Sequence, residues 1–134
     1  MKSSREWAII AAESAAEKKA ENVMAIEVAE LLVVTDFFVI ASGRTDIQVR
    51  AIADEVEHGL LERGDIKPIG REGVAEGRWV LLDYGDLVVH VFQPHEREFY
   101  RLEKLWSDAP RLSLPPEVVN EVRDDTPAES PVEY

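Results

Sequence analysis

The chain has 134 residues, 46% of them hydrophobic and none of them cysteine, with a formal net charge of −12 at pH 7. This size and hydrophobic share are enough for one domain with a real core. The charge argues against a nucleic-acid-binding protein, which needs clustered Lys and Arg for phosphates, and the missing cysteine excludes disulfides and thiolate metal sites.

The chain begins with a predicted helix followed by a short strand. Ser3 and Glu6 have the spacing of a capping box, and the alanine-rich stretch 4–21 predicts a helix. Asn22 is a residue that can end a helix in the left-handed conformation. Residues 23–28 predict a strand. No signal-peptide core precedes these elements and no apolar run is long enough to span a membrane, so we expect a cytoplasmic protein.

A buried strand and a second helix come next. The stretch 32–41 contains a nearly continuous apolar run, as expected of a strand that is covered on both faces. Thr45 and Gln48 form another capping box, and Gly64 is a natural helix-ending residue, so a helix is predicted between them. Residues 66–69 are then expected to re-enter the sheet beside the buried strand.

A β-hairpin follows a glycine-rich link at residues 70–77 and is the least ambiguous element of the chain. The apolar runs 80–82 and 87–92 flank a turn, and we expect a two-residue loop at Tyr84 and Gly85. Alternation then gives two faces. The predicted core face carries Val80, Leu82, Leu87, Val89 and Val91; the mixed face carries Trp79, Leu81, Asp83, Asp86, Val88 and His90.

The last predicted helix, 95–106, carries an apolar stripe of Phe99, Leu102, Leu105 and Trp106. Beyond it the composition changes, because five of the seven prolines lie past residue 108 among acidic residues. Such a segment buries too little apolar surface to offset its ordering entropy. We therefore expect one domain over residues 1–108 and an acidic, largely disordered tail over residues 109–134.

The mixed face of the hairpin is the candidate functional surface. Trp79 belongs either to a second core layer under a helix or to a partly exposed anchor, and Trp and Tyr are enriched at binding hot spots. With Tyr84 at the turn and Asp83 and Asp86 beside it, the exposed alternative gives an aromatic centre with acidic edges. Such a patch suits a basic protein partner. His90 is expected to pack against Trp79 instead of acting as a base.

Catalytic and cofactor sites find little support in the sequence. Asp83 and Asp86 are the only close carboxylate pair in the hairpin. Two aspartates that flank a turn converge on one cation only if their rotamers happen to allow it. The three histidines are too dispersed to form a zinc site, and no spacing suggests a nucleophilic triad. We therefore expect no metal, no cofactor and no enzymatic activity.

Four segments together closely resemble the ribosomal silencing factor family, also called Iojap-related. They are TDFFVIASGRTDIQVRAIADEV, PIGREG, RWVLLDYGDLVVHVF and REFYRLEKLW, and the resemblance covers roughly residues 5–107. The resemblance implies a single α/β domain with a mixed sheet of about five strands and a nucleotidyltransferase-like topology. It also implies binding to the large ribosomal subunit through large-subunit ribosomal protein fourteen, a steric block to small-subunit joining, repression of translation, and frequent homodimers.

On this hypothesis Trp79 anchors the contact, Asp83, Tyr84 and Asp86 surround it, His90 supports it, and Glu103 meets a basic group of the partner. The rival hypothesis is a nucleotide-binding or residual nucleotidyltransferase-like enzyme that uses Asp36, Ser42, Asp83 and Asp86 with a divalent metal. Nucleotidyltransferases typically carry Gly-Ser and Asp-x-Asp elements, whereas this chain has Ser42-Gly43 in reversed order and no Asp-x-Asp. The departure favours a binding protein.

Overall fold

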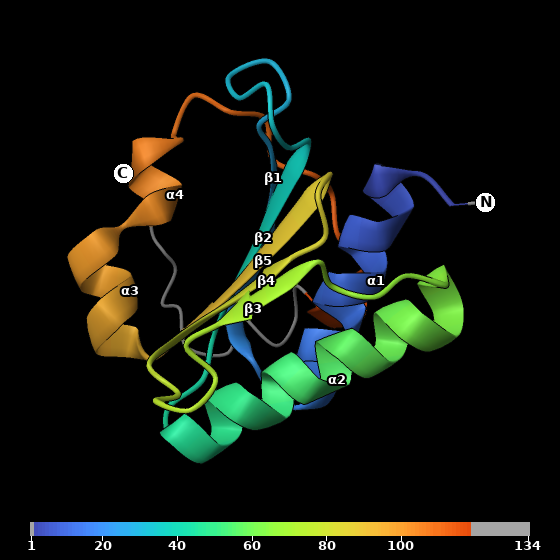
Figure 1. The fold of residues 1–134 in the computed structure, drawn as a ribbon. Helices are drawn as coiled ribbons and strands as arrows, with labels where there is room; N and C mark the ends of the chain where they lie inside the picture. The colour runs from blue at the N-terminus through green and yellow to red at the C-terminus, as the bar shows by residue number, and fades with distance from the viewer. Residues whose placement is uncertain (1, 119–134) are drawn as a thin grey trace.

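The computed structural model describes residues 2–118 and shows a mixed five-stranded sheet between two unequal layers of helices (Figure 1). The elements in chain order are α1 (Ser4–Glu17), β1 (Glu21–Glu27), β2 (Phe37–Ser42), α2 (Asp46–Gly64), β3 (Gly70–Glu72), β4 (Trp79–Asp83), β5 (Leu87–Phe92), α3 (Pro94–Tyr100) and α4 (Leu102–Leu105). The sheet order is β1-β2-β5-β4-β3, in which only β2 and β5 pair in parallel. This confirms the predicted single α/β domain. Within residues 2–118, no helix combines the length and apolar character needed to cross a bilayer.

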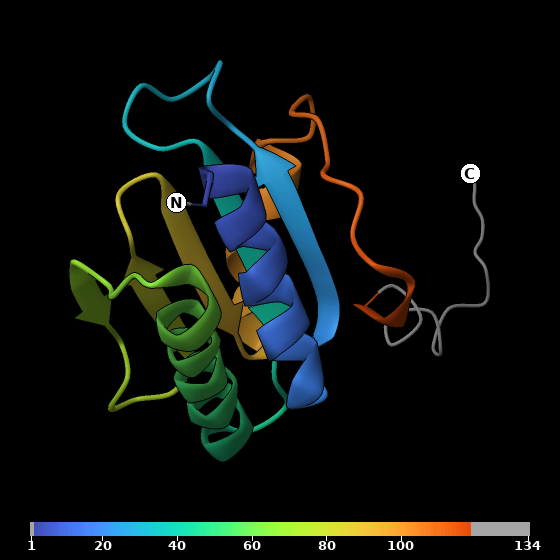
Figure 2. The same cartoon turned by 90° about the vertical axis from the view of Figure 1, so that its right-hand side faces the viewer.

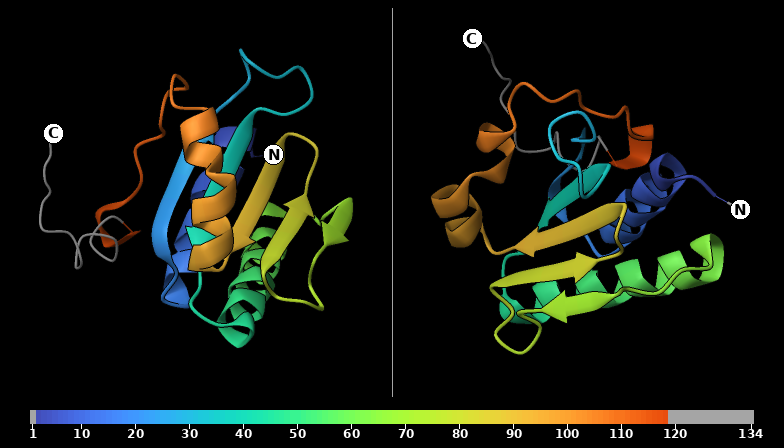
Figure 3. Two further views of the ribbon diagram at one scale, coloured as in Figure 1. Left: turned by 90° about the vertical axis from the view of Figure 1, so that its left-hand side faces the viewer. Right: turned by 45° about the horizontal axis from the view of Figure 1, so that its top comes forward.

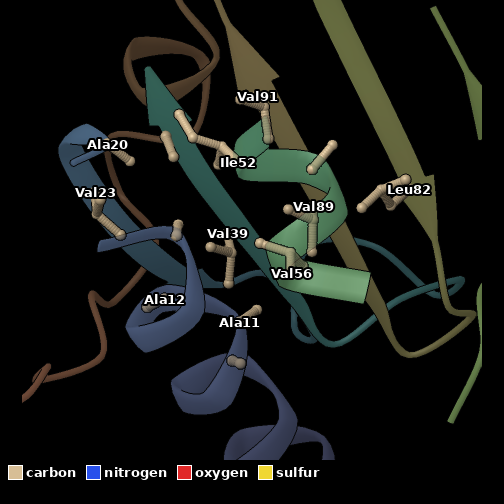
Figure 4. Packing of buried hydrophobic residues seen from close by; sticks show 14 of the residues in the cluster. Ala11, Ala12, Ala20, Val23, Val39, Ile52, Val56, Leu82, Val89 and Val91 are labelled. Carbon is tan, nitrogen blue, oxygen red and sulfur yellow. The ribbon is translucent and has the colours of Figure 1, made fainter. Parts of the chain in front are cut away.

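The main core lies between the sheet and the long helices α1 and α2, which cover one face (Figure 2). All six residues of β2 are buried, as the continuous apolar run predicts for a central strand. Small residues of α1, including Ala11 and Ala12, let this helix lie close to the sheet, where Val39 and Val89 meet α2 residues such as Val56 (Figure 4). Close packing of this kind makes the loss of even one methylene costly.

The helix starts follow the capping residues, whereas the helix ends differ from the predictions. The Ser3 and Thr45 hydroxyls accept hydrogen bonds from the third helical amides, as expected. The first helix ends at Glu17, and Asn22 is indeed left-handed (φ 51°) but lies in an irregularity of β1. Helix α2 ends at Gly64, and the left-handed residue that caps it is Asp65 instead of Gly64. The prediction that Asn22 ends a helix is therefore wrong.

Residues 66–69 do not form the strand that we predicted beside β2. The parallel neighbour of β2 is β5, and residues 66–69 lead to the far edge of the sheet, where β3 occupies part of the supposed glycine-rich link. Ile66 packs against the main core, and Pro68 has no amide hydrogen to donate to a neighbouring strand. A short apolar run did not reveal which strand it would join.

The hairpin register is displaced by two residues from the prediction. Asp83 lies opposite Val88 and the Tyr84 amide donates to the Leu87 carbonyl, so the turn is centred on Gly85 and Asp86 instead of Tyr84 and Gly85. The cause is local: the Asp83 carboxylate accepts the Gly85 amide at 2.9 Å, and Gly85 has a φ of +88°. Because the displacement is even, the predicted core face is preserved, and Val80, Leu82, Leu87, Val89 and Val91 are all buried.

The predicted C-terminal helix is broken into α3 and α4 at Arg101, which has a left-handed φ of 50°. The break turns the apolar stripe, so that Leu102 and Trp106 pack on a second, smaller cluster while Phe99 and Leu105 are exposed. This cluster lies on the sheet face opposite α1 and α2, around Phe38 and Phe92. The prediction of one helix with a continuous apolar stripe is therefore wrong.

The segment after α4 closes one edge of the sheet. Arg111 bridges Ile26 of β1 in antiparallel fashion, the Leu112 amide donates to Ala25, and the Glu27 amide donates to Pro110. Further along, Val118 is fully buried in the main core. Residues 119–134, the greater part of the predicted tail, lie outside the described residues.

Gly73 is expected to be essential for the link between β3 and β4. Its φ is +79°, and a Cβ atom there would lie 2.0 Å from the Trp79 carbonyl oxygen, which is backbone and has little freedom to move. Gly73→Ala should therefore destabilise the domain by about 2 kcal/mol or more. Urea unfolding followed by circular dichroism measures this, with Gly70→Ala as the matched control, because nothing lies within 4 Å of that position. Equal stability of the two variants would contradict the assignment.

Candidate functional site: the uncovered sheet face

Part of the second sheet face is left without a helix. Helices α3 and α4 are short and lie over the β1, β2 and β5 side, while β4 and β3 extend beyond them (Figure 3). On this face Leu81 and Val88 are half-buried, although they are sheet residues with apolar side chains. We call the surface formed by Trp79, Leu81, Asp83, Val88 and the flanking loops the open face.

Trp79 combines the two alternatives that the sequence leaves open. Its indole stacks on Phe92 with ring centroids 4.8 Å apart and contacts Tyr100 of α3 at 4.6 Å, so it belongs to the second cluster. It is nevertheless only half-buried. The indole Nε1–H also donates to His90 Nδ1 at 3.1 Å. Trp79 is thus a partly exposed ring held in one orientation by three neighbours.

His90 is buried and neutral, and it accepts a hydrogen bond from Trp79. Its side chain is 5% exposed, and burial lowers its pKa to about 4. Because Nδ1 accepts the Trp79 proton, the neutral ring must carry its own proton on Nε2. That Nε2 atom has no hydrogen-bond partner among residues 2–118. The expected packing of His90 against Trp79 is confirmed, and its low pKa makes it a poor base at neutral pH.

Tyr84 does not join Trp79, and the expected exposed pair of aromatic residues is wrong. Tyr84 is 7% exposed and belongs to the main core on the α1 and α2 side, where burial raises the pKa of its phenol. Alternation along β4 explains this, since Tyr84 continues the series of Val80 and Leu82 onto the core face. The aromatic neighbour of Trp79 at the surface is instead Tyr100.

The two turn carboxylates occupy the end of the hairpin. Asp83 is half-buried and uses Oδ1 for the Gly85 amide, which leaves its second oxygen available. Asp86 is exposed, and its carbonyl accepts the amides of Asp36 and Phe37, so its backbone is fixed while its carboxylate faces solvent. The hairpin end therefore presents negative charge beside the open face.

Glu103 is engaged inside the protein. Its Oε2 accepts from Arg97 Nε at 3.1 Å, and Arg97 Nη1 donates to Ser42 Oγ at 2.8 Å. Arg97 is 7% exposed; burial lowers its pKa, and the Glu103 carboxylate opposes that effect. This network ties α3 and α4 to the end of β2. Glu103 is a positioning residue for α3 and α4, a role that its sequence context did not indicate.

The structure does not bring the residues of the rival enzyme hypothesis together. Ser42 lies at one end of β2 and pairs with Phe92, whereas Phe37 at the other end pairs with Leu87, next to Asp86. The two ends are roughly 16 Å apart at about 3.3 Å per residue. Asp36 accepts from the Ser4 hydroxyl at 2.9 Å. Within the described range 2–118, no three His, Asp or Glu residues are grouped so as to hold a metal ion.

The fold and the site define a small α/β domain whose open face combines aromatic side chains with acidic residues at its margin. The model of the family described as "Ribosomal silencing factor during starvation" matches residues 1–133. The chain belongs to the ribosomal silencing factor family.

The chain is 47% identical over 105 residues to ribosomal silencing factor RsfS of Bacillus subtilis, which covers 78% of this chain and 88% of the relative. It is also 29% identical over 130 residues to "Mitochondrial assembly of ribosomal large subunit protein 1" of Mus musculus. That match covers 88% of this chain and 57% of the relative. Among solved structures, a Chromobacterium violaceum protein is similar with a TM-score of 0.76 and 33% identity, covering 79% of this chain and 88% of that one. The crystal structure of a Bacillus halodurans protein is similar with a TM-score of 0.67 and 43% sequence identity. The match covers 78% of this chain and 94% of that one.

Burial of neutral His90 predicts a loss of stability in mild acid. An unfolded imidazole with the ordinary pKa of about 6.5 takes up a proton before the buried ring with a pKa of about 4 does. The contribution of neutral His90 to the free energy of unfolding is therefore fully present above pH 6.5 and is lost as the pH falls toward 4. About 2 kcal/mol of it is lost between pH 7 and 5. Urea unfolding of His90→Phe should show a flatter pH dependence, while His58→Gln, at an exposed position, should follow the wild type. The same slope in all three proteins would exclude this role.

Proposed function

We propose that this protein is a non-enzymatic factor that binds the large ribosomal subunit in the cytoplasm and sterically blocks joining of the small subunit, thereby repressing translation. Its contact on the subunit is large-subunit ribosomal protein fourteen. The observation that carries the proposal is the open face, where Trp79 stays half-buried beside α3 and Asp83 and Asp86 provide an acidic margin. Family membership supports the ribosome as the target.

Charge supports a basic protein as the partner. The chain carries a net charge of −12, and Asp86 places an exposed carboxylate beside the open face. Complementary charge of this kind raises association rates and fixes the orientation of the complex. Asp83 contributes its free oxygen to the same margin. Glu103 adds less to partner binding than the sequence suggests, because it is paired with Arg97.

The geometry of Trp79 supports an anchoring role. A partly exposed aromatic ring that is already held by Phe92, Tyr100 and His90 loses little conformational entropy when a partner covers it. Tyr100 extends this aromatic surface onto α3, and Phe99, which is 72% exposed, extends it further. Aromatic residues in such positions are frequent binding hot spots.

A second copy of the chain is the competing occupant of the same face. Homodimerisation through the open face would have to yield to ribosome binding, because the two partners would cover the same residues. Analytical ultracentrifugation over a concentration series, with and without large subunits, measures whether self-association and ribosome binding exclude each other.

Trp79→Glu is expected to abolish co-sedimentation with purified large subunits, because it places a charge at the anchor. Ile47→Glu is the matched control, since Ile47 is exposed on α2, on the other side of the sheet. Circular dichroism checks that both variants are folded. Undiminished co-sedimentation of folded Trp79→Glu would remove Trp79 from the contact.

Asp86→Lys provides a test that leaves the aromatic cluster intact. It should weaken large-subunit binding by about tenfold through charge reversal, equivalent to about 1.4 kcal/mol. The control, Asp54→Lys, makes the same change of charge at an exposed position on α2. A subunit-joining assay by light scattering should show inhibition by wild type and Asp54→Lys and weaker inhibition by Asp86→Lys. If the wild-type protein leaves joining unaffected, the proposed function is wrong.

A further inference from the structure

A groove of about 450 Å³ lies on the open face, next to Trp79 but separate from it. Leu81 and Val88 of the hairpin form part of its base. Val34, from the connection before β2, and Ile69, from the segment before β3, form two of its walls. Residues from three distant parts of the sequence therefore create one apolar depression.

The walls of this groove are themselves open to solvent. Val34 is 77% exposed and Ile69 is 75% exposed, although both are large apolar side chains. A small ligand is normally enclosed over most of its surface, and two such exposed walls do not enclose one. An extended protein segment, in contrast, can lie between the walls and cover them. The shape favours a segment of a protein over a small molecule.

Two buried polar atoms on the lining of the groove lack hydrogen-bond partners. They are Thr35 Oγ1 and His90 Nε2, and neither is bonded within the described part of the chain. Such atoms are uncommon in folded proteins because each one costs free energy. Both atoms are inaccessible to solvent, so neither is available to a partner that occupies the groove.

The charged residues of the groove are both acidic. Asp83 lines it with one carboxylate oxygen free, and Glu72 of β3 is exposed and makes no ion pair within residues 2–118. No basic residue is part of the lining. A Lys or Arg on the partner segment would therefore find two carboxylates at this side of the groove.

We propose that the groove receives an extended segment of the basic ribosomal partner, an inference that rests on the proposed function and specifies its contact. An apolar side chain of the segment lies between Val34 and Ile69. A neighbouring Lys or Arg of the segment pairs with Asp83 and Glu72. The groove therefore selects a segment in which an apolar residue is next to a basic one. Trp79 alone would bind many apolar surfaces and would be less specific.

The decisive experiment compares Val34→Glu with Val33→Glu in co-sedimentation with purified large subunits. Val33 is 102% exposed and is not part of the groove, so the two variants carry the same charge change at adjacent positions. Val34→Glu should weaken binding by at least about tenfold and Val33→Glu by less than about twofold. Equal effects of the two substitutions, whether both large or both absent, overturn the groove assignment.

The acidic side of the groove has its own matched pair. Glu72→Lys should weaken binding, whereas Glu76→Lys, an exposed position outside the groove, should not. Equal binding by the two variants removes Glu72 from the contact and overturns the acidic part of the proposal.

The failures of the two proposals can be told apart. If the wild-type protein does not bind large subunits, both the proposed function and the groove contact are wrong. If the wild type binds and Val34→Glu binds equally well, only the groove contact is wrong. If Val34→Glu abolishes self-association in ultracentrifugation but leaves ribosome binding unchanged, the occupant is a second copy of this chain, and the proposal is overturned.

Discussion

The central parallel pair of β2 and β5 sets the main constraint on this structure. All six residues of β2 are buried, so the strand must be covered on both faces. The long helices α1 and α2 cover one face of the central strands. The second face has only the seven residues of α3 and the four of α4, which are too short to reach across the whole sheet. The open face exists because the central strands are covered first and the strands β4 and β3 lie beyond the remaining helices.

The position of α3 and α4 depends on a few polar contacts as well as on apolar packing. Arg97 reaches from α3 to Ser42 at the end of β2 and to Glu103 in α4, and these three residues connect two helices and a strand. A buried guanidinium that lost either partner would be costly, so the network favours one arrangement of the helices. This arrangement also brings Tyr100 against Trp79. The aromatic surface and the buried ion pair are therefore parts of one assembly.

The sequence predicted the parts of the fold that depend on local patterns. Capping residues located the helix starts, and alternation assigned the core face of the hairpin even though the register was displaced by two residues. It did not predict what depends on distant contacts: the strand order, the left-handed break at Arg101, or the ion pair that engages Glu103. Tyr84 is instructive, because alternation extended one residue beyond the predicted strand would have placed it with Val80 and Leu82 on the core face, where it lies. Its place at a predicted turn had suggested exposure.

The pairing of Arg111 with Ile26 has a consequence for assembly. A sheet grows by adding strands to an unpaired edge, and here part of one edge, at residues 25–27 of β1, is already paired with residues 110–112. Among the described residues, β3 is the edge strand that remains, and it is three residues long. Among residues 2–118, neither edge therefore presents a long unpaired strand to an identical copy. The fold can thus expose an apolar sheet face without also exposing a long strand edge beside it.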